Sequence, residues 1–258
     1  CEEIQGEMIL GMSGRGFATQ IIKGFDTNFD LSACVSCGAC VQTCPTEALS
    51  DKFETKTLIP DEVTRTTCTY CGVGCQLDVS VINGKIKGIQ APDTAEVNHG
   101  HTCLKGRFAF QFYNHPDRLT DPLIKKNGKF EVVSWEEAYD FMTEKLLKIK
   151  NDYGADSIGC ISSSRATNEE NYLMQKMTRV ALNTNNIDGC ARVCHAPTAY
   201  GMQKAFGTGA ATNSIIDLKE TDCIFLFGAN PTEAHPVTGA RIKQLFMQGI
   251  TSIVVDPV

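Results

Sequence analysis

The stretch that decides how the first part of this chain folds is Cys34-Val-Ser-Cys37-Gly-Ala-Cys40-Val-Gln-Thr-Cys44-Pro45. Its C-x2-C-x2-C-x3-C-P spacing is a bacterial iron–sulfur pattern, in which the first three thiolates hold one 4Fe–4S cluster and the fourth ligates a different cluster. A structural zinc knuckle needs only four soft ligands and rarely has this triple spacing. The sequence therefore predicts a cluster-binding module at this end of the chain.

By this spacing rule, the run supplies only three of the four thiolates of its own cluster. Cys44 would ligate a different cluster, so a third cluster is implied. Cys1 is the expected donor of the missing ligand, because a helix-like Glu-Glu-Ile-Gln follows it. The chain begins with Cys1 rather than Met, and residues 251–258 read as a strand and the start of a loop. We therefore expect a fragment of a longer polypeptide.

A second set of four cysteines has the spacing Cys68-x2-Cys71-x3-Cys75-x27-Cys103. Glycines between the first three cysteines allow the backbone to curl around a metal group. A zinc ribbon prefers two matched pairs rather than three cysteines plus one. This set predicts a second complete 4Fe–4S cluster.

The composition is that of an ordinary globular protein, with 42% hydrophobic residues and a net charge of -6. The charge gives no reason to expect nucleic acid as a partner, and no apolar run approaches the roughly 18–20 residues of a membrane span. Most of the 13 cysteines sit in tight runs typical of metal ligation, which favours a reducing, cytoplasmic location over a disulfide scaffold.

The pattern of secondary structure changes along the chain. Turn signals at Asn83-Gly84 and Asn127-Gly128 predict hairpins. From Ser134 onward, helices with capping boxes at 134–137 and 167–170, and a third helix at 237–248, alternate with apolar strands at 157–162, 222–228 and 250–256. We predict an α/β protein with a ferredoxin-type cluster module at residues 1–60, a β-rich 4Fe–4S subdomain at 61–115, and an incomplete parallel α/β sheet domain at 116–258.

A Cys194-His195 pair precedes a proline that opens a helix. A thiol beside an imidazole also suits the nucleophile and base of a cysteine hydrolase, although there the His lies far away in the sequence. Taken alone the dipeptide is a weak signal, and the nearby Cys160, Cys190 and Cys223 read as small buried hydrophobic residues. Ligands of parallel sheets bind beyond the carboxyl ends of the strands, so we expect a cofactor at the loops after these strands.

Four segments together resemble the molybdopterin oxidoreductases, and within them the formate dehydrogenase catalytic subunit. They are Cys68-Thr-Tyr-Cys71-Gly-Val-Gly-Cys75, Cys103-Leu-Lys-Gly-Arg107, Arg192-Val-Cys-His-Ala-Pro197 and Gly228-Ala-Asn-Pro-Thr-Glu-Ala-His-Pro236. The resemblance covers essentially the whole chain. The additional ferredoxin-type module is similar to that of the cytoplasmic, NAD(P)-linked or hydrogenase-linked members.

The resemblance implies a role for individual residues. Cys194 is the implied protein ligand of molybdenum or tungsten, held by a bis(pyranopterin guanine dinucleotide), and His195 is the implied catalytic imidazole. Lys105 is implied to lie between a cluster and a pterin. The implied cofactor contacts are Lys105, Ser162, Arg165, Gly228, Asn230, Thr232, Glu233, His235 and Asp256, and the implied metal ligands are Cys1, Cys34, Cys37, Cys40, Cys44, Cys68, Cys71, Cys75, Cys103 and Cys194.

By this resemblance the substrate pair is formate and CO2, and the partners are iron–sulfur or flavin subunits that accept electrons. Two rival interpretations are a Cys-ligated nitrate reductase, against which His195 argues, and a complex-I-like electron carrier without molybdenum or tungsten. The intact Cys194-His195 pair favours the enzyme. The sequence does not choose between the two metals, name the electron acceptor or fix the direction of reaction.

Overall fold

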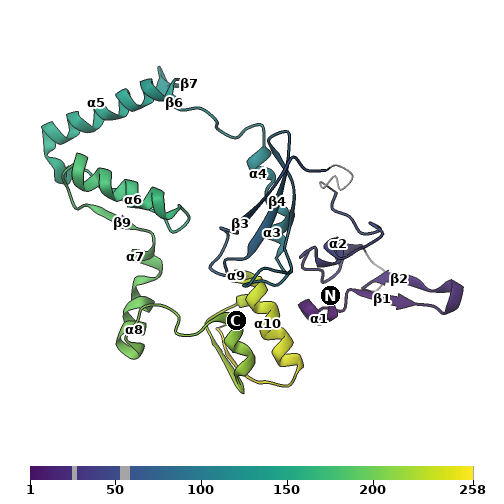
Figure 1. Ribbon diagram of the computed structural model, residues 1–258. Helices are drawn as coiled ribbons and strands as arrows, with labels where there is room; N and C mark the ends of the chain where they lie inside the picture. The colour runs from purple at the N-terminus through teal and green to yellow at the C-terminus, as the bar shows by residue number, and fades with distance from the viewer. Residues whose placement is uncertain (25–27, 53–58, 258) are drawn as a thin grey trace. The chain divides into compact units, whose positions relative to one another are not determined.

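The computed structural model describes residues 1–24, 28–52 and 59–257 (Figure 1). The chain folds as two compact units, one made of residues 1–116 and 213–258 and the other of residues 117–212. Both ends of the chain therefore belong to the first unit. Small sheets of two or three strands and short helices build each unit. The expected module boundary at residue 60 follows residues 53–58, which lie outside the described residues.

The N-terminal part of the first unit consists of short elements. Helix α1 (Glu2–Gln5) ends at Gly6, whose φ of +68° is the left-handed conformation that commonly ends helices. Strands β1 (Leu10–Ser13) and β2 (Gln20–Lys23) form an antiparallel hairpin, and α2 (Ala39–Gln42) follows further along the chain. Two 3-10 turns, Gly16–Ala18 and Phe29–Leu31, complete this part.

A three-stranded antiparallel sheet follows, in the order β3-β4-β5. The Asn83-Gly84 hairpin prediction is confirmed, because both residues have positive φ (51° and 70°) and join β4 to β5. Strand β3 was not predicted, since all six of its residues are exposed and give no alternating apolar pattern. The strands are β3 (Glu62–Thr67), β4 (Gln76–Ile82) and β5 (Lys85–Gln90), followed by helices α3 (Leu104–Phe108) and α4 (Gln111–Asn114).

The C-terminal part of the first unit is a parallel strand pair with a helix beside it. Strands β10 (Cys223–Phe227) and β11 (Thr251–Val255) pair in parallel, as the alternating pattern predicted. Helix α10 (Pro236–Met247) joins two apolar clusters. Its first turn packs on the cysteine-rich loop through Val237, while Ile242 and Leu245 pack beneath β10. The remaining elements here are the 3-10 turn Ile215–Glu220 and helix α9 (Pro231–Ala234).

The second unit carries the long helix α5 (Trp135–Tyr153) and the parallel strand pair β8–β9. The Ser134 and Thr167 side chains both accept hydrogen bonds from the backbone, of Glu137 and Glu170 respectively, so both N-caps are confirmed. The reciprocal bond of a full capping box is present at Thr167–Glu170, whereas the Glu137 carboxylate pairs with Lys126. Strand β9 was missed, because three residues are too few to show a period. The other elements are β6 (Leu123–Lys126), β7 (Lys129–Val132), the 3-10 turn Ala155–Ser157, β8 (Cys160–Ser162), α6 (Asn168–Lys176), the π-turn Met177–Ala181, β9 (Ile187–Gly189), α7 (Ala191–Cys194) and α8 (Ala196–Phe206).

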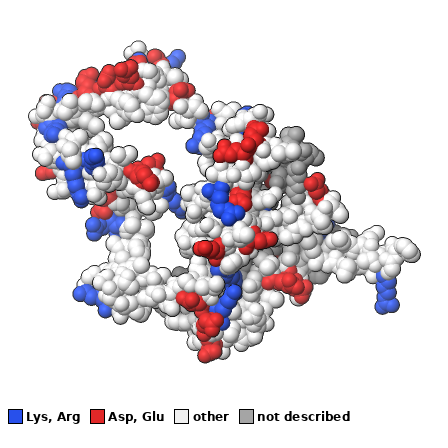
Figure 2. Space-filling view, viewed as in Figure 1, with Lys and Arg blue, Asp and Glu red and all other residues white. Residues whose placement is uncertain are grey.

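Acidic and basic side chains are interspersed over the face drawn in Figure 2, with an acidic stretch over α5. The first turn of this helix contains Glu136 and Glu137. Acidic groups suit that position, because the first turn of a helix carries a partial positive charge. No helix among the residues that the structure describes is long and apolar enough to cross a membrane.

Candidate cluster and metal–pterin sites

The second cysteine set is gathered into one place by a tight loop. The backbone N–H of Cys68 donates to the carbonyl oxygen of Cys75 at 2.7 Å, and Gly74 turns the chain between them with φ +68°. Burial, followed by the nearby sulfur atoms of Cys68, Cys71 and Cys103, raises the pKa of the Cys75 thiol to about 12. All four predicted ligands therefore interact with one another.

Such a set fits a cationic metal group. Four thiolates crowded together repel one another, and the positive charge of a bound metal offsets that repulsion and favours the deprotonated form of each ligand. The loop is anchored from behind, since Cys75 belongs to the apolar cluster that also contains Val73, Leu77 and Val237. No three His, Cys, Asp or Glu side chains are grouped around a single metal-ion position within the described ranges.

The helix that begins after Cys103 leaves space beside these thiols. A Cβ built on Gly106 would lie 3.6 Å from the Cys68 sulfur and 2.3 Å from the Thr102 hydroxyl oxygen, so glycine is needed there. The Thr102 hydroxyl is fully buried and has no hydrogen-bond partner in the described part of the chain. Buried polar atoms nearly always have a hydrogen-bond partner, so a polar or charged group bound beside Cys103 would account for the unpaired hydroxyl.

In the ferredoxin-type run, three cysteines interact with one another and the fourth lies apart from them. Burial, then the sulfur atoms of Cys37 and Cys34, raises the pKa of the Cys40 thiol. Cys44 instead lies in its own turn, where the Leu49 backbone N–H and the Thr46 hydroxyl lower the pKa of its thiol to about 7. Cys1 is half-buried at the start of α1.

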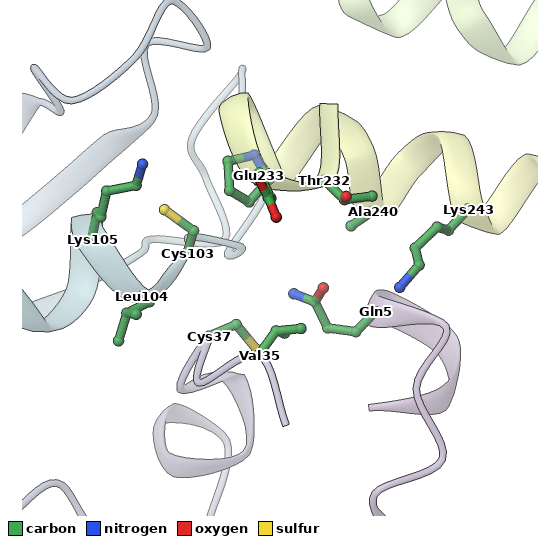
Figure 3. A pocket seen from close by; sticks show the side chains of 11 residues that line it. Gln5, Val35, Cys37, Cys103, Leu104, Lys105, Thr232, Glu233, Ala240 and Lys243 are labelled. Carbon is green, nitrogen blue, oxygen red and sulfur yellow. The ribbon is translucent and has the colours of Figure 1, made fainter. Parts of the chain in front are cut away.

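A cavity of about 240 Å³ lies beside both cysteine sets (Figure 3). Cys37 and Cys103 both line it, and Lys105 contributes from α3. Burial raises the pKa of the Cys68 thiol, and the nearby Lys105 ammonium opposes that shift. Lys105 is therefore adjacent to the second cysteine set. The cavity is lined by Gln5, Val35, Cys37, Cys103, Leu104, Lys105, Thr232, Glu233, Pro236, Ala240 and Lys243.

The loop that follows β10 reaches this same region. Gly228 donates its backbone N–H to the Val255 carbonyl at 2.8 Å, so the ends of the two parallel strands lie together. Thr232 and Glu233 line the cavity, while the His235 ring nitrogen Nε2 lies 3.9 Å from a Cβ built on Gly72. Asn230 precedes α9 and accepts a hydrogen bond from the Thr232 hydroxyl, and Asp256 is exposed just after β11.

In the second unit, Cys190 lies at the carboxyl ends of β8 and β9, and the implied metal thiolate Cys194 follows one helical turn further along the chain. Cys190 joins the two strand ends: its N–H donates to the Ser162 carbonyl at 3.2 Å, and its sulfur accepts from the Ser164 N–H at 3.3 Å. Cys194 and His195 are exposed at the end of α7. Arg165 follows in the loop after β8.

A cavity of about 390 Å³ opens at these same strand ends, lined by Ser162, Asn171, Tyr172, Gln175, Ile187, Asp188 and Gly189. Ser162 therefore lines a cavity at the strand ends, and its contact with a cofactor stays a prediction. The interpretation of Cys190 and Cys223 as buried hydrophobic residues is wrong, because both are exposed. The Cys190 thiol is instead hydrogen-bonded to Ser164, and these bonds lower its pKa.

Sequence reasoning gave no role to several residues that shape the cysteine sites. His101 is buried, and burial, followed by the charges of Arg107 and Arg241, lowers the pKa of its ring to about 4. The Arg107 guanidinium is also buried and bonds to the Cys37 carbonyl. The only sequence signal for Arg107 was its place in the Cys103–Arg107 motif.

Comparison with known families identifies the class of protein. Residues 118–258 match the molybdopterin oxidoreductase family, residues 61–115 match the molybdopterin oxidoreductase Fe4S4 domain, and residues 27–50 match a 4Fe-4S binding domain. The first match spans more than half of the chain. The chain therefore belongs to the molybdopterin oxidoreductase family, and the resemblance inferred from its motifs is confirmed.

Among individual relatives, the chain is similar to the F420-dependent formate dehydrogenase subunit alpha of Methanocaldococcus jannaschii, with 45% identity over 196 residues, which is 76% of this chain and 28% of the relative. It is 43% identical to F420-dependent formate dehydrogenase 1 subunit alpha of Methanococcus maripaludis, over 74% of this chain and 28% of that protein. The chain thus spans about 28% of the length of these relatives.

A solved structure, acetylene hydratase from Pelobacter acetylenicus, superposes with a TM-score of 0.61 over 75% of this chain and 27% of that one. At 24% identity this likeness supports the fold alone.

Proposed function

We propose that the protein carrying this chain interconverts formate and CO2 at a molybdenum or tungsten pterin centre and passes the electrons to iron–sulfur clusters. The observation that carries the proposal is an exposed Cys194-His195 pair at the end of α7, the helical turn that follows β9, in a chain 45% identical to a named formate dehydrogenase subunit. When bound, the metal–pterin group would supply the two-electron chemistry that protein side chains lack.

Each residue of the chain has a distinct task in this proposal. The Cys194 thiolate is a soft ligand for the metal, and its exposure at the end of α7 leaves it accessible. The His195 imidazole orients the formate carboxylate or accepts the proton as CO2 forms, because an imidazole can present one ring nitrogen as a proton acceptor. Lys105 places a positive charge beside the second cysteine set, where negative charge arrives.

The cysteines divide among clusters as their spacing predicts. We assign Cys68, Cys71, Cys75 and Cys103 to one 4Fe–4S cluster, which the mutual effects of their thiols support. Cys1, Cys34, Cys37 and Cys40 are assigned to a second, and Cys44 to a third. The separate turn that holds Cys44 supports assigning it to a different cluster from Cys34, Cys37 and Cys40.

We further propose that pterin guanine dinucleotides contact the strand-end loops. The support is that Ser162 lines one cavity and that Thr232 and Glu233 line another. The two parallel strand pairs are proposed to belong to one α/β catalytic domain from residue 116 onward, preceded by the cluster modules 1–60 and 61–115. Electron-accepting iron–sulfur or flavin subunits and a cytoplasmic location complete the proposal. None of the thirteen cysteines, all of which the structure describes, is paired in a disulfide, which agrees with a reducing compartment.

A matched pair of cysteine variants tests the proposal. Cys194→Ser is expected to abolish formate-dependent dye reduction by the holoenzyme while its iron content stays at the wild-type value. Cys223→Ser, which changes another exposed cysteine, in β10, is expected to keep full activity. Equal activity in wild type and Cys194→Ser would refute the assigned metal ligand.

A further inference from the structure

Arg107 touches both cysteine sets of the first unit. Its side chain is 4% exposed, and its Nε donates to the carbonyl oxygen of Cys37 at 2.9 Å. Its own backbone N–H donates to the carbonyl of Cys103 at 3.0 Å, as part of the helix that begins after this cysteine. Arg107 is therefore hydrogen-bonded to a ligand residue of each set, by its buried guanidinium to Cys37 and by its backbone N–H to Cys103.

The ferredoxin-type loop is shaped to admit this side chain. Gly38 has a φ of +71°, and a Cβ built there would lie 2.1 Å from Cδ and 2.6 Å from Nε of Arg107, and 2.8 Å from the Phe108 ring. Contacts that short do not occur between real atoms, so only glycine allows the guanidinium stem to pass. Gly38, which follows Cys37, thus leaves the space that the side chain of Arg107, four residues after Cys103, occupies.

Further hydrogen bonds fix the position of the guanidinium and of the loop it reaches. Nη1 of Arg107 donates to the Ile89 carbonyl at 3.3 Å, at the end of β5. Gln42, in the helix that contains Cys40, exchanges two hydrogen bonds with the Ala91 backbone, at 2.7 Å and 3.0 Å. The ferredoxin-type loop and the second cysteine set are therefore held against a common strand end.

We propose that Arg107 is a positioning residue that raises the reduction potential of the cluster held by Cys34, Cys37 and Cys40 and keeps it in register with the cluster of Cys103. This inference rests on the proposed function, because it needs both clusters. A guanidinium stays protonated at all working pH values, and a buried charge acts through a low effective dielectric. Nearby charge and hydrogen bonds are among the factors that set cluster potentials.

The Arg107 charge affects the transfer of a single electron between the two clusters. When one electron leaves one cluster and enters the other, the first is oxidised, the second is reduced, and no proton moves. The receiving cluster gains one negative charge, which the fixed Arg107 cation stabilises. Removing the cation makes the reduced form less favourable and moves the midpoint potential to more negative values.

The test compares Arg107→Gln with Arg107→Lys in the purified holoenzyme, by redox titration followed by electron paramagnetic resonance. The signal of interest is the one altered by Cys37→Ser. For Arg107→Gln we expect the ratio of reduced to oxidised cluster, at a fixed solution potential, to fall about tenfold, or about 59 mV for a one-electron couple. Arg107→Lys keeps the charge and should keep the potential. As a control, Arg65→Gln removes an exposed cation of the same unit and should shift nothing.

Unchanged potentials in Arg107→Gln, or equal shifts in the Gln and Lys variants, would overturn the inference. If Arg107→Gln loses its iron, Arg107→Lys decides: retained iron and potential support the role of charge, and loss of either contradicts it. A wild-type protein without cluster signals would instead be a failure of the proposed function, which is a distinguishable result.

Discussion

The amide nitrogen of Gln5 and ring nitrogen Nε2 of His101 meet at 2.6 Å, although 96 residues separate them in the chain. Both side chains are buried, and the depressed pKa of His101, about 4, keeps its ring neutral at pH 7. A neutral ring with the proton on Nδ1 accepts at Nε2, so the Gln5 amide donates. This contact ties helix α1, next to Cys1, to the segment that leads into Cys103.

Removing the donor should therefore weaken the first unit. For Gln5→Leu we expect a loss of about 1–3 kcal/mol of unfolding free energy, because a buried acceptor is left without a partner. Gln244→Leu is the control. It also removes a hydrogen bond to α1, from Gln244 to the Ile4 carbonyl, but at an exposed position, and should cost about 0.5–1.5 kcal/mol. Urea titration followed by the visible absorbance of the clusters compares the two, and equal losses would contradict the account.

Gly38 and Gly84 offer a matched pair for the close approach of Arg107. Their φ values are almost equal, +71° and +70°, but only Gly38 has atoms within reach of an added Cβ. Gly84→Ala should cost about 1–2 kcal/mol for the left-handed backbone alone. Gly38→Ala should cost about 1–3 kcal/mol more, from overpacking against Arg107. The same urea titration measures both variants, and a difference near zero would show that the Arg107 stem is not held in place.

His195 is predicted to act in proton transfer or substrate orientation. We expect His195→Gln to lower kcat for formate by about 10²–10⁴, the range typical of a general acid or base, with iron, molybdenum and tungsten contents unchanged. His115→Gln, which alters an exposed histidine of the other unit, should leave kcat at the wild-type value. Steady-state assays with a redox dye provide the measurement. Unaltered kcat in His195→Gln would remove this residue from the mechanism.

The capping box of α6 gives a prediction that depends on no cofactor. Thr167 accepts from the Glu170 N–H at 3.2 Å, and the Glu170 carboxylate accepts from the Thr167 N–H at 2.7 Å. Thr167→Ala should destabilise the second unit by about 1 kcal/mol, whereas Thr167→Ser keeps the hydroxyl and should change little. Hydrogen exchange of the α6 amides compares the two variants, and identical protection would contradict the predicted role.

The sequence predicted the parts of the fold that depend on local chemistry. Asn83-Gly84 and the caps at Ser134 and Thr167 act within a few residues, and all three are confirmed. Strand β3 escaped notice, because its six residues are all exposed and its partner strand lies beyond the cysteine loop. Pairing of this kind depends on distant residues and leaves no periodic pattern.

The candidate site likewise has parts that the sequence predicted and parts that only the structure shows. Cysteine spacing alone identified the two sets, and the structure gathers the thiols of the Cys68–Cys103 set. The contacts that connect the sets, from Arg107 to Cys37 and from Gln5 to His101, join segments about 70 and 96 residues apart. A long-range contact by a common residue type has no signal in one sequence, so only the folded chain shows it.

Elemental analysis of the purified holoenzyme for iron, molybdenum and tungsten, made together with formate-dependent dye reduction, tests the central claim most directly. The account predicts iron for several 4Fe–4S clusters, molybdenum or tungsten in stoichiometric amount, and dye reduction that requires formate. Iron with neither heavy metal and without formate activity would contradict it, and would point to an electron carrier built on the same fold.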